Sequence, residues 1–146
     1  MTFGFQNATA NSPEIDTQAE AVVAFLQGFS IWSQHLHINF RHSQNNPDIL
    51  IAWGDPQCAT YATACTSLPT DGDMIYDSEE VWAQTSPPPQ GNVDIVAFAC
   101  HEVGYALGLD DSDNEAAMMH GRIPNGRRRL IAEDVDDAVA LRYRRR

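Results

Sequence analysis

The segment ACHEVGYALGLDDSDNEAAMMHGR, residues 99–122, contains the side chains whose types and spacing could do chemistry. In a helix, residues four apart lie on the same face, so His101 and Tyr105 would point in the same direction. Imidazole nitrogens and carboxylate oxygens are zinc ligands, so His101 and Asp111 could hold this metal. The carboxylate of Glu102, beside the first ligand, could then take a proton from a metal-bound water. The segment therefore predicts a zinc-dependent hydrolytic site.

One position departs from what a strong zinc site uses. Tyr105 occupies the position at which a second histidine would coordinate the metal. Its phenol has an ordinary pKa near 10 and binds zinc poorly unless it is ionised. Gly108 would turn the chain so that Asp111 can approach the metal, and Met118 or Met119 could supply an apolar floor beneath it. The pattern predicts a metal site with an unusual donor set.

The elements that must position these residues can be predicted from apolar spacing and capping residues. Apolar residues at steps of three and four predict a helix over residues 12–34, with Thr17 and Glu20 as a capping box. Asn92 as the N-cap and a glycine as the stop predict a largely buried helix over residues 93–108.

The remaining elements are shorter. A last helix is predicted over residues 132–146, because acids in its first turn and arginines in its last turn suit the helix dipole. Alternating apolar residues predict strands, and Gly, Pro, Ser and Asp predict loops. The predicted strands are 2–5, 37–40, 48–53 and 73–77, and the predicted loops are 54–73 and 86–92.

Composition excludes several classes of function. The 146 residues suit one domain, and no apolar run is long enough to span a bilayer. The net charge is -11, and before residue 122 Arg41 is the only basic residue apart from histidine, so nucleic acid is not an expected partner. The first ten residues lack the pattern of a signal peptide. Cys58 and Cys65 could form a disulfide, but their spacing leaves this open.

The segment from His101 to Met119 resembles the metzincin signature HExxHxxGxxH with its Met-turn, and it is most similar to that of the matrixins. The resemblance extends over nearly the whole chain through GFSIWSQHLHINF, PDILIAWG, GDMIYDSEEVW and LIAEDVDDAVALRY. It implies an α+β fold with a twisted, mostly parallel sheet of about five strands, three helices and an active-site helix followed by a Met-turn. Residues 1–146 would form a single catalytic domain, with no pro-domain or C-terminal module in this chain.

The resemblance also assigns roles to individual residues. It implies that Glu102 is the general base and that Met119 is the Met-turn methionine. The zinc ligands that it implies are His101, Tyr105 and Asp111. The structural calcium ligands that it implies belong to two sites, Asp77 and Glu80 in an acidic turn and Asp48 and Asp73 in a second site that ties a strand to the loop.

Two functions remain open at this point. The first is a zinc metalloendopeptidase of a protein or peptide substrate, whose activity is impaired by the His/Tyr/Asp metal site. The second is a catalytically inactive metzincin-like domain that binds protein. By the resemblance alone, we expect a secreted, extracellular protein that is a monomer.

Overall fold

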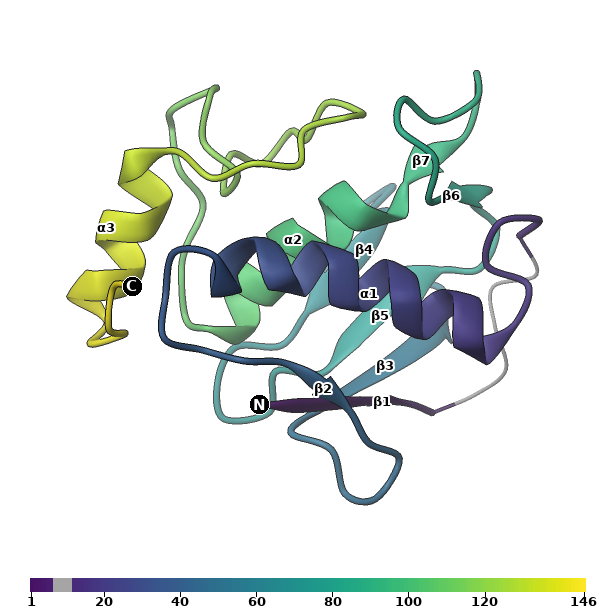
Figure 1. Ribbon diagram of the computed structural model, residues 1–146. Coiled ribbons are helices and arrows are strands. Elements are labelled where there is room, and N and C mark those ends of the chain that lie inside the picture. Colours follow the sequence, from purple (N-terminus) through teal and green to yellow (C-terminus); the bar gives the residue numbers. More distant parts are fainter. Residues whose placement is uncertain (7–11) are drawn as a thin grey trace.

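The computed structural model describes residues 1–6 and 12–146, so residues 7–10 of the N-terminal stretch considered above lie outside it. Five strands form one sheet in the order β2-β1-β3-β5-β4. All neighbours are parallel except β4, which runs antiparallel to β5 and forms one edge (Figure 1). The strands are β1 (Thr2–Phe5), β2 (Arg41–His42), β3 (Ile49–Gly54), β4 (Ala64–Thr66) and β5 (Met74–Asp77).

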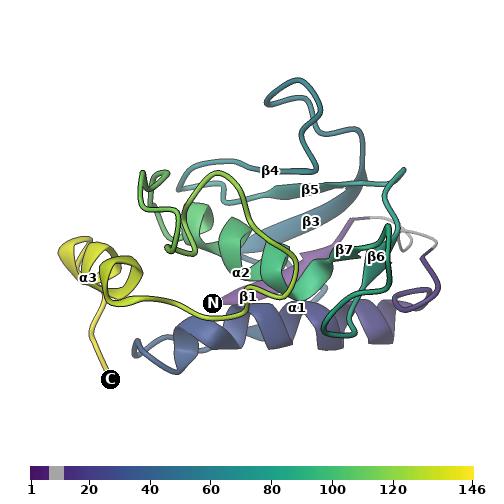
Figure 2. The same ribbon diagram turned by 90° about the horizontal axis from the view of Figure 1, so that it is seen from above.

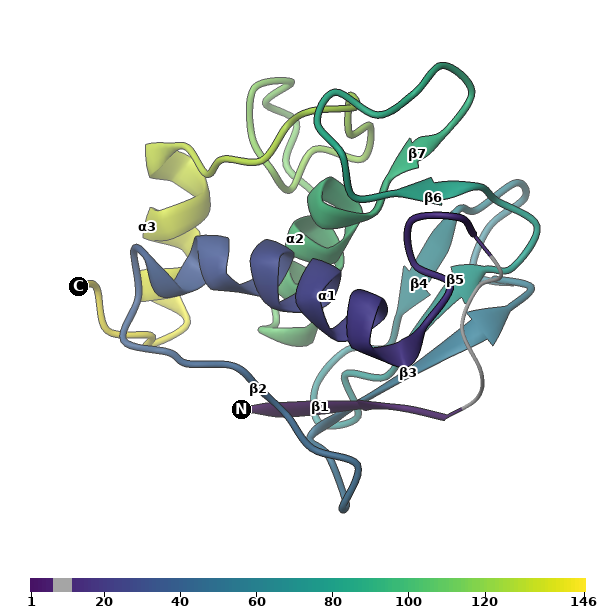
Figure 3. The ribbon, with the colours of Figure 1, turned by 45° about the vertical axis from the view of Figure 1, so that its right-hand side comes forward.

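Three helices accompany this sheet. Helices α1 and α2 pack against each other on one face of the sheet, and α3 lies apart from it at one end (Figures 1 and 2). A separate parallel pair of short strands lies beside the start of α2 (Figure 3). These elements are α1 (Gln18–Ser33), α2 (Ile95–Ala106), α3 (Ala132–Ala140), β6 (Trp82–Ala83) and β7 (Val93–Asp94). The predicted fold class, a mostly parallel sheet with three helices, is confirmed.

Helix α1 is joined to α2 by close packing and one buried hydrogen bond. The indole nitrogen of Trp32 donates to the carbonyl of Cys100 at 2.8 Å. At Gly28, an added Cβ would lie 2.6 Å from the Cβ of Ala99, so only glycine lets the two helices approach this closely. The predicted capping box is present, because Thr17 and Glu20 each accept a hydrogen bond from the other's backbone N–H.

Helix α2 is fixed at both ends. Its N-cap is Asp94, two residues after the predicted Asn92, and the Asp94 carboxylate accepts from the N–H groups of Val96 and Ala97. Its C-terminus closes on Gly108, whose φ of +99° is accompanied by a hydrogen bond from the N–H of Leu109 to the carbonyl of Gly104. The predicted glycine stop is therefore correct.

Three predicted elements differ from the structure. The predicted strand at 37–40 is displaced, because pairing with β1 begins only at Arg41. Strand β4 lies inside the predicted loop 54–73, because its three residues become a strand only by pairing with β5. The last helix ends at Ala140 rather than at 146, so no arginine lies in its last turn.

The C-terminal residues form a tail that pairs with another segment instead of continuing the last helix. Arg142 adopts a φ of +74°, which ends α3, and the chain then runs back along the segment that follows α1. The N–H of His37 donates to the carbonyl of Arg144, and the N–H of Arg146 donates to the carbonyl of His35, both at 2.7 Å. Backbone pairing with this segment outweighs the dipole argument for a longer helix.

Within the described part of the chain, no helix is both long and apolar enough to cross a membrane. Whether residues 1–146 form one whole domain of the protein stays a prediction.

Candidate active site

A cleft of about 540 Å³ lies between the edge strand β4, helix α2 and the chain that follows α2, and its lining includes the three predicted zinc ligands and Glu102. Thr66 contributes from β4, and His101, Glu102 and Tyr105 contribute from α2. Asp111 and Ile123 reach the cleft from the chain beyond the helix.

His101 is held in one orientation by the backbone. Its side chain is buried, and Nδ1 donates to the carbonyl of Met118 at 2.7 Å, since a carbonyl can only accept. Burial lowers the pKa of His101, although the hydrogen bond to Met118 opposes this shift. A neutral imidazole with its proton on Nδ1 leaves the Nε2 lone pair free, which is the form that binds metals.

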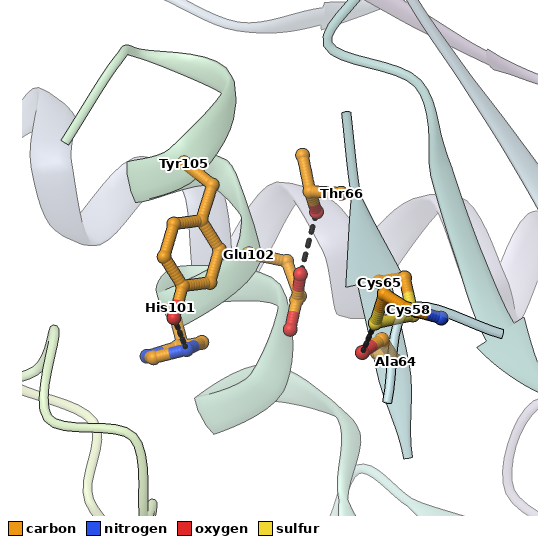
Figure 4. The surroundings of a disulfide bond; sticks show 7 residues. All are labelled: Cys58, Ala64, Cys65, Thr66, His101, Glu102 and Tyr105. Atoms are coloured by element: carbon orange, nitrogen blue, oxygen red, sulfur yellow. Dashed lines mark hydrogen bonds between the residues drawn. A yellow bond between two sulfur atoms is a disulfide. The ribbon is translucent and has the colours of Figure 1, made fainter. Parts of the chain in front are cut away.

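Nε2 of His101 faces the hydroxyl of Tyr105. The two atoms are 3.0 Å apart, the two rings are perpendicular, and the same hydroxyl donates to the carboxylate of Asp111. The side chains of His101, Tyr105 and Asp111 thus converge on one point, and the phenol oxygen lies between the other two donors. Figure 4 shows the Tyr105 hydroxyl pointing at the His101 ring.

This donor set fits zinc poorly. Burial and then the hydrogen bond to Asp111 raise the pKa of Tyr105 well above its ordinary value, so its phenol remains neutral. Structural and catalytic zinc sites use thiolate, imidazole and carboxylate donors, and a neutral phenol is not among them. Among the described residues, no group of three or more His, Cys, Asp or Glu side chains is placed to hold a metal. Zinc binding by His101, Tyr105 and Asp111 stays a prediction.

Glu102 points away from this group, toward the edge strand. Its Oε2 accepts a hydrogen bond of 2.5 Å from the hydroxyl of Thr66, as Figure 4 shows. Burial raises the pKa of Glu102 to about 7, against the opposing effect of the Thr66 hydrogen bond. The carboxyl group therefore takes up and releases a proton near neutral pH, which is the property that proton transfer requires.

Met118 and Met119 lie against α2. The side chain of Met119 packs against the backbone of Gly104, where an added Cβ would lie 2.2 Å from the sulfur. Both Met118 and Met119 are buried, and their backbone N–H groups donate to the carboxylate of Asp134 at 3.0 and 3.1 Å. Helix α3 therefore fixes the turn at Met118 and Met119, and the carbonyl of Met118 in that turn orients His101.

The chain that follows the methionines is anchored beside the start of α2. The guanidinium of Arg128 lies 2.8 Å from the buried carboxylate of Asp94 and also donates to the carbonyl of Gln84. Nδ1 of His120 accepts a hydrogen bond from the N–H of Arg122, so this ring nitrogen holds the conformation of the loop. These contacts position Ile123 in the cleft wall.

Three of the four predicted calcium ligands, Asp48, Asp73 and Asp77, accept hydrogen bonds from backbone N–H groups. Asp48 accepts from the N–H of Thr2 at 2.6 Å, and Asp73 accepts from the N–H of Leu50 at 2.9 Å. Asp77 accepts from the N–H of Glu79 at 2.8 Å within the turn that contains Glu80. These contacts are those of carboxylates that cap backbone, and calcium binding stays a prediction.

Sequence reasoning missed several contributors to the cleft, among them Thr66 and Tyr61. Thr66 lies in the unpredicted strand β4, so nothing in the sequence connected it with Glu102. Tyr61 lies in the loop between Cys58 and Cys65, which are joined by a disulfide in the structure. The cysteine spacing was the one available signal that this loop has a fixed shape.

The chain is similar to known metalloendoproteinases over almost its whole length. A sequence model of the family described as Matrixin matches residues 1–143. Metalloendoproteinase 1 of Glycine max is 29% identical, over 98% of this chain and 50% of the relative. Karilysin of Tannerella forsythia is 26% identical, over 90% of this chain and 30% of the relative. Matrix metalloproteinase-18 of Xenopus laevis is 24% identical, over 98% of this chain and 32% of the relative. The chain thus spans half or less of the length of these relatives.

Proposed function

This chain belongs to the matrixin family of peptidases, and from that premise we propose that it binds extended peptides in the cleft while hydrolysing them poorly. The fold and the cleft support the first half of this proposal. The bridging hydroxyl of Tyr105 supports the second half, and it is the observation that carries the proposal.

The edge strand β4 is suited to hold a peptide. It ends the five-stranded sheet, so the N–H and C=O groups on its outer side are not used by a sixth strand of that sheet. Residues of β4 also line the cleft, together with those of α2. An extended peptide can add to such an edge as a further strand, with backbone hydrogen bonds giving affinity and side-chain pockets giving specificity.

The chemistry of the site supports weak hydrolysis. When zinc is bound in enzymes of this family, it polarises the carbonyl of the peptide bond to be cleaved and activates a water molecule. Here the single imidazole and the carboxylate that could bind it are both engaged by a neutral phenol. The raised pKa of Glu102 supports a role as general base, so the site could retain one catalytic group without a fitting metal cage.

Metal content and peptide cleavage, measured on the same preparations, test this proposal. The chain as it stands should hold less than one zinc after purification without chelator and should cleave a fluorescence-quenched peptide library slowly. Tyr105→His should bind zinc at least about tenfold more tightly, because altered surroundings of ligands alone cost this much affinity. Adding Glu102→Ala to Tyr105→His should keep the zinc and abolish cleavage. One tightly bound zinc with equal turnover in the chain as it stands would overturn the proposal.

The disulfide supports a proposal about location. Disulfides persist in oxidising compartments, so the Cys58–Cys65 bond favours an extracellular protein.

A further inference from the structure

We infer that the cleft selects peptides with a positively charged side chain, which packs on Tyr61 at the rim and faces Asp110 inside. This inference rests on the proposed peptide binding and adds the chemical class of the peptide. Both residues line the same cavity of about 540 Å³ that contains Glu102.

Tyr61 is an aromatic side chain placed at the mouth of the cleft without burial of its own. It is 98% exposed, more than any other large hydrophobic residue of the described chain. Leu68, which follows β4 in the chain, is a second exposed apolar residue that lines the cleft, with 60% exposure. Tyrosine supplies large contact area at a small cost in conformational entropy, which is why it is common at the centres of protein interfaces.

The loop that carries Tyr61 is fixed at both ends. The Cys58–Cys65 disulfide closes it, and the N–H of Cys58 donates to the sulfur of Cys65 at 3.2 Å. The carbonyl of Thr63 accepts from the N–H of Asp77, which joins the loop to the end of β5. A preorganised loop loses less freedom when a ligand binds, so an exposed ring on it can contribute most of its contact energy to binding.

The charge of the cavity decides which side chain fits. Its acidic lining residues are Glu102, Asp110 and Asp111, and its lining includes no lysine or arginine. Two arginines of the neighbouring loop are engaged elsewhere, Arg128 with Asp94 and Arg127 with the carbonyl of Ala117. A cavity lined by one sign of charge concentrates ligands of the opposite sign and rejects those of its own sign.

A cation satisfies both features at once. A guanidinium can stack on the face of a phenol ring while its N–H groups donate to a carboxylate. Asp110 and Asp111 are both exposed, but Asp111 already accepts from the Tyr105 hydroxyl. Asp110 can therefore meet a charged side chain without the cost of full desolvation. An uncharged apolar side chain would use Tyr61 alone and make no favourable contact with Asp110.

Three labelled decapeptides test the inference by fluorescence anisotropy. They share a sequence of alanine, valine and serine and differ at one central position, which is arginine, glutamine or glutamate. The arginine peptide should bind about tenfold more tightly than the glutamate peptide at low salt, and the ratio should shrink at high salt.

Variants connect the preference with the two residues. Tyr61→Ala should weaken binding of the arginine peptide about fivefold, whereas Tyr61→Phe should retain it, because phenylalanine keeps the aromatic face. Asp110→Asn should reduce the ratio between the arginine and glutamate peptides. Leu141→Ala is the control, since Leu141 is a 47% exposed apolar residue that does not line the cleft.

The outcomes separate this inference from the proposed function. Equal binding of all three peptides would overturn the charge preference and leave peptide binding standing. Absence of binding by any peptide would overturn peptide binding, and the preference with it. An arginine preference unchanged by Tyr61→Ala and Asp110→Asn would show that another surface selects the charge and would overturn the assignment.

Discussion

The hydroxyl oxygen of Tyr105 lies 3.0 Å from Nε2 of His101, the one nitrogen of that ring not used by the backbone. The phenol has a single proton, and the hydroxyl also contacts the carboxylate of Asp111. One proton cannot serve both contacts, so either His101 or Asp111 must provide a second proton for both to be hydrogen bonds. The residues proposed for the metal site therefore bind one another through Tyr105.

Tyr105→Phe tests how much this contact stabilises the fold. Removing the hydroxyl leaves Nε2 of His101, in a buried ring, without its side-chain partner. We expect a loss of about 1–2 kcal/mol in the free energy of unfolding, measured by urea denaturation near pH 7. Tyr143→Phe is a matched control, because its hydroxyl donates to the carbonyl of Leu107 and lies outside the cleft lining. A more stable Tyr105→Phe variant would mean that the bridge is strained rather than favourable.

Arg128→Met tests the anchor between the loop after the methionines and the start of α2. The side chain of Asp94 is completely buried and that of Arg128 is 16% exposed, so the substitution leaves a buried charge without its partner. We expect a loss of about 3 kcal/mol in the free energy of unfolding. Arg145→Met is the control: it breaks the exposed pair between Arg145 and Asp136 and should change stability by less than about 1 kcal/mol. Similar losses in both variants would contradict this assignment.

Much of the site could be predicted from residues close together in the chain. The spacing of His101 and Tyr105 on one helix face, with Gly108 as the stop, depends on local geometry, and the structure brings Asp111 to them. The capping box of Thr17 and Glu20 is equally local. Apolar periodicity and the family resemblance together predicted the sheet and the helices.

The contacts that could not be predicted join residues far apart in the sequence. Arg128 and Asp94 are 34 residues apart, and Thr66 and Glu102 are 36 residues apart. Strand β4 has only three residues, and its conformation depends on its pairing with β5. The last helix was predicted too long, because its arginines instead belong to a tail that pairs with the chain after α1.

Gly104→Ala tests the packing of Met119 beneath the active-site helix. In an exposed helix this change stabilises by about 1 kcal/mol, because alanine has the higher helix propensity. Here the new Cβ would lie 2.2 Å from the sulfur of Met119 and 3.3 Å from the ring of Trp32, so overpacking should dominate. We expect a net loss of about 1–3 kcal/mol in thermal or urea unfolding.

Gly121→Ala is the control for that substitution, since no heavy atom would lie within 4 Å of its added Cβ. We expect little change there. If Gly104→Ala were as stable as the chain as it stands, Met119 would have to move freely, and the turn would not have the fixed position described above.

Glu133→Gln tests the contact between α3 and the chain after α2 through its dependence on pH. Hydrogen bonds from Ser112 and then Asn114 hold the pKa of Glu133 below its usual value of 4.5. A lowered pKa in the folded state stabilises the fold above the pKa of the unfolded chain, and this contribution disappears as the pH falls through the folded value. The melting temperature should therefore decline less steeply below pH 4.5 in the variant. Because Glu133 lies at the surface and is only partly buried, the two curves should differ modestly at neutral pH and meet in strong acid. Parallel curves across the whole range would show that Glu133 is not held by these two donors in solution.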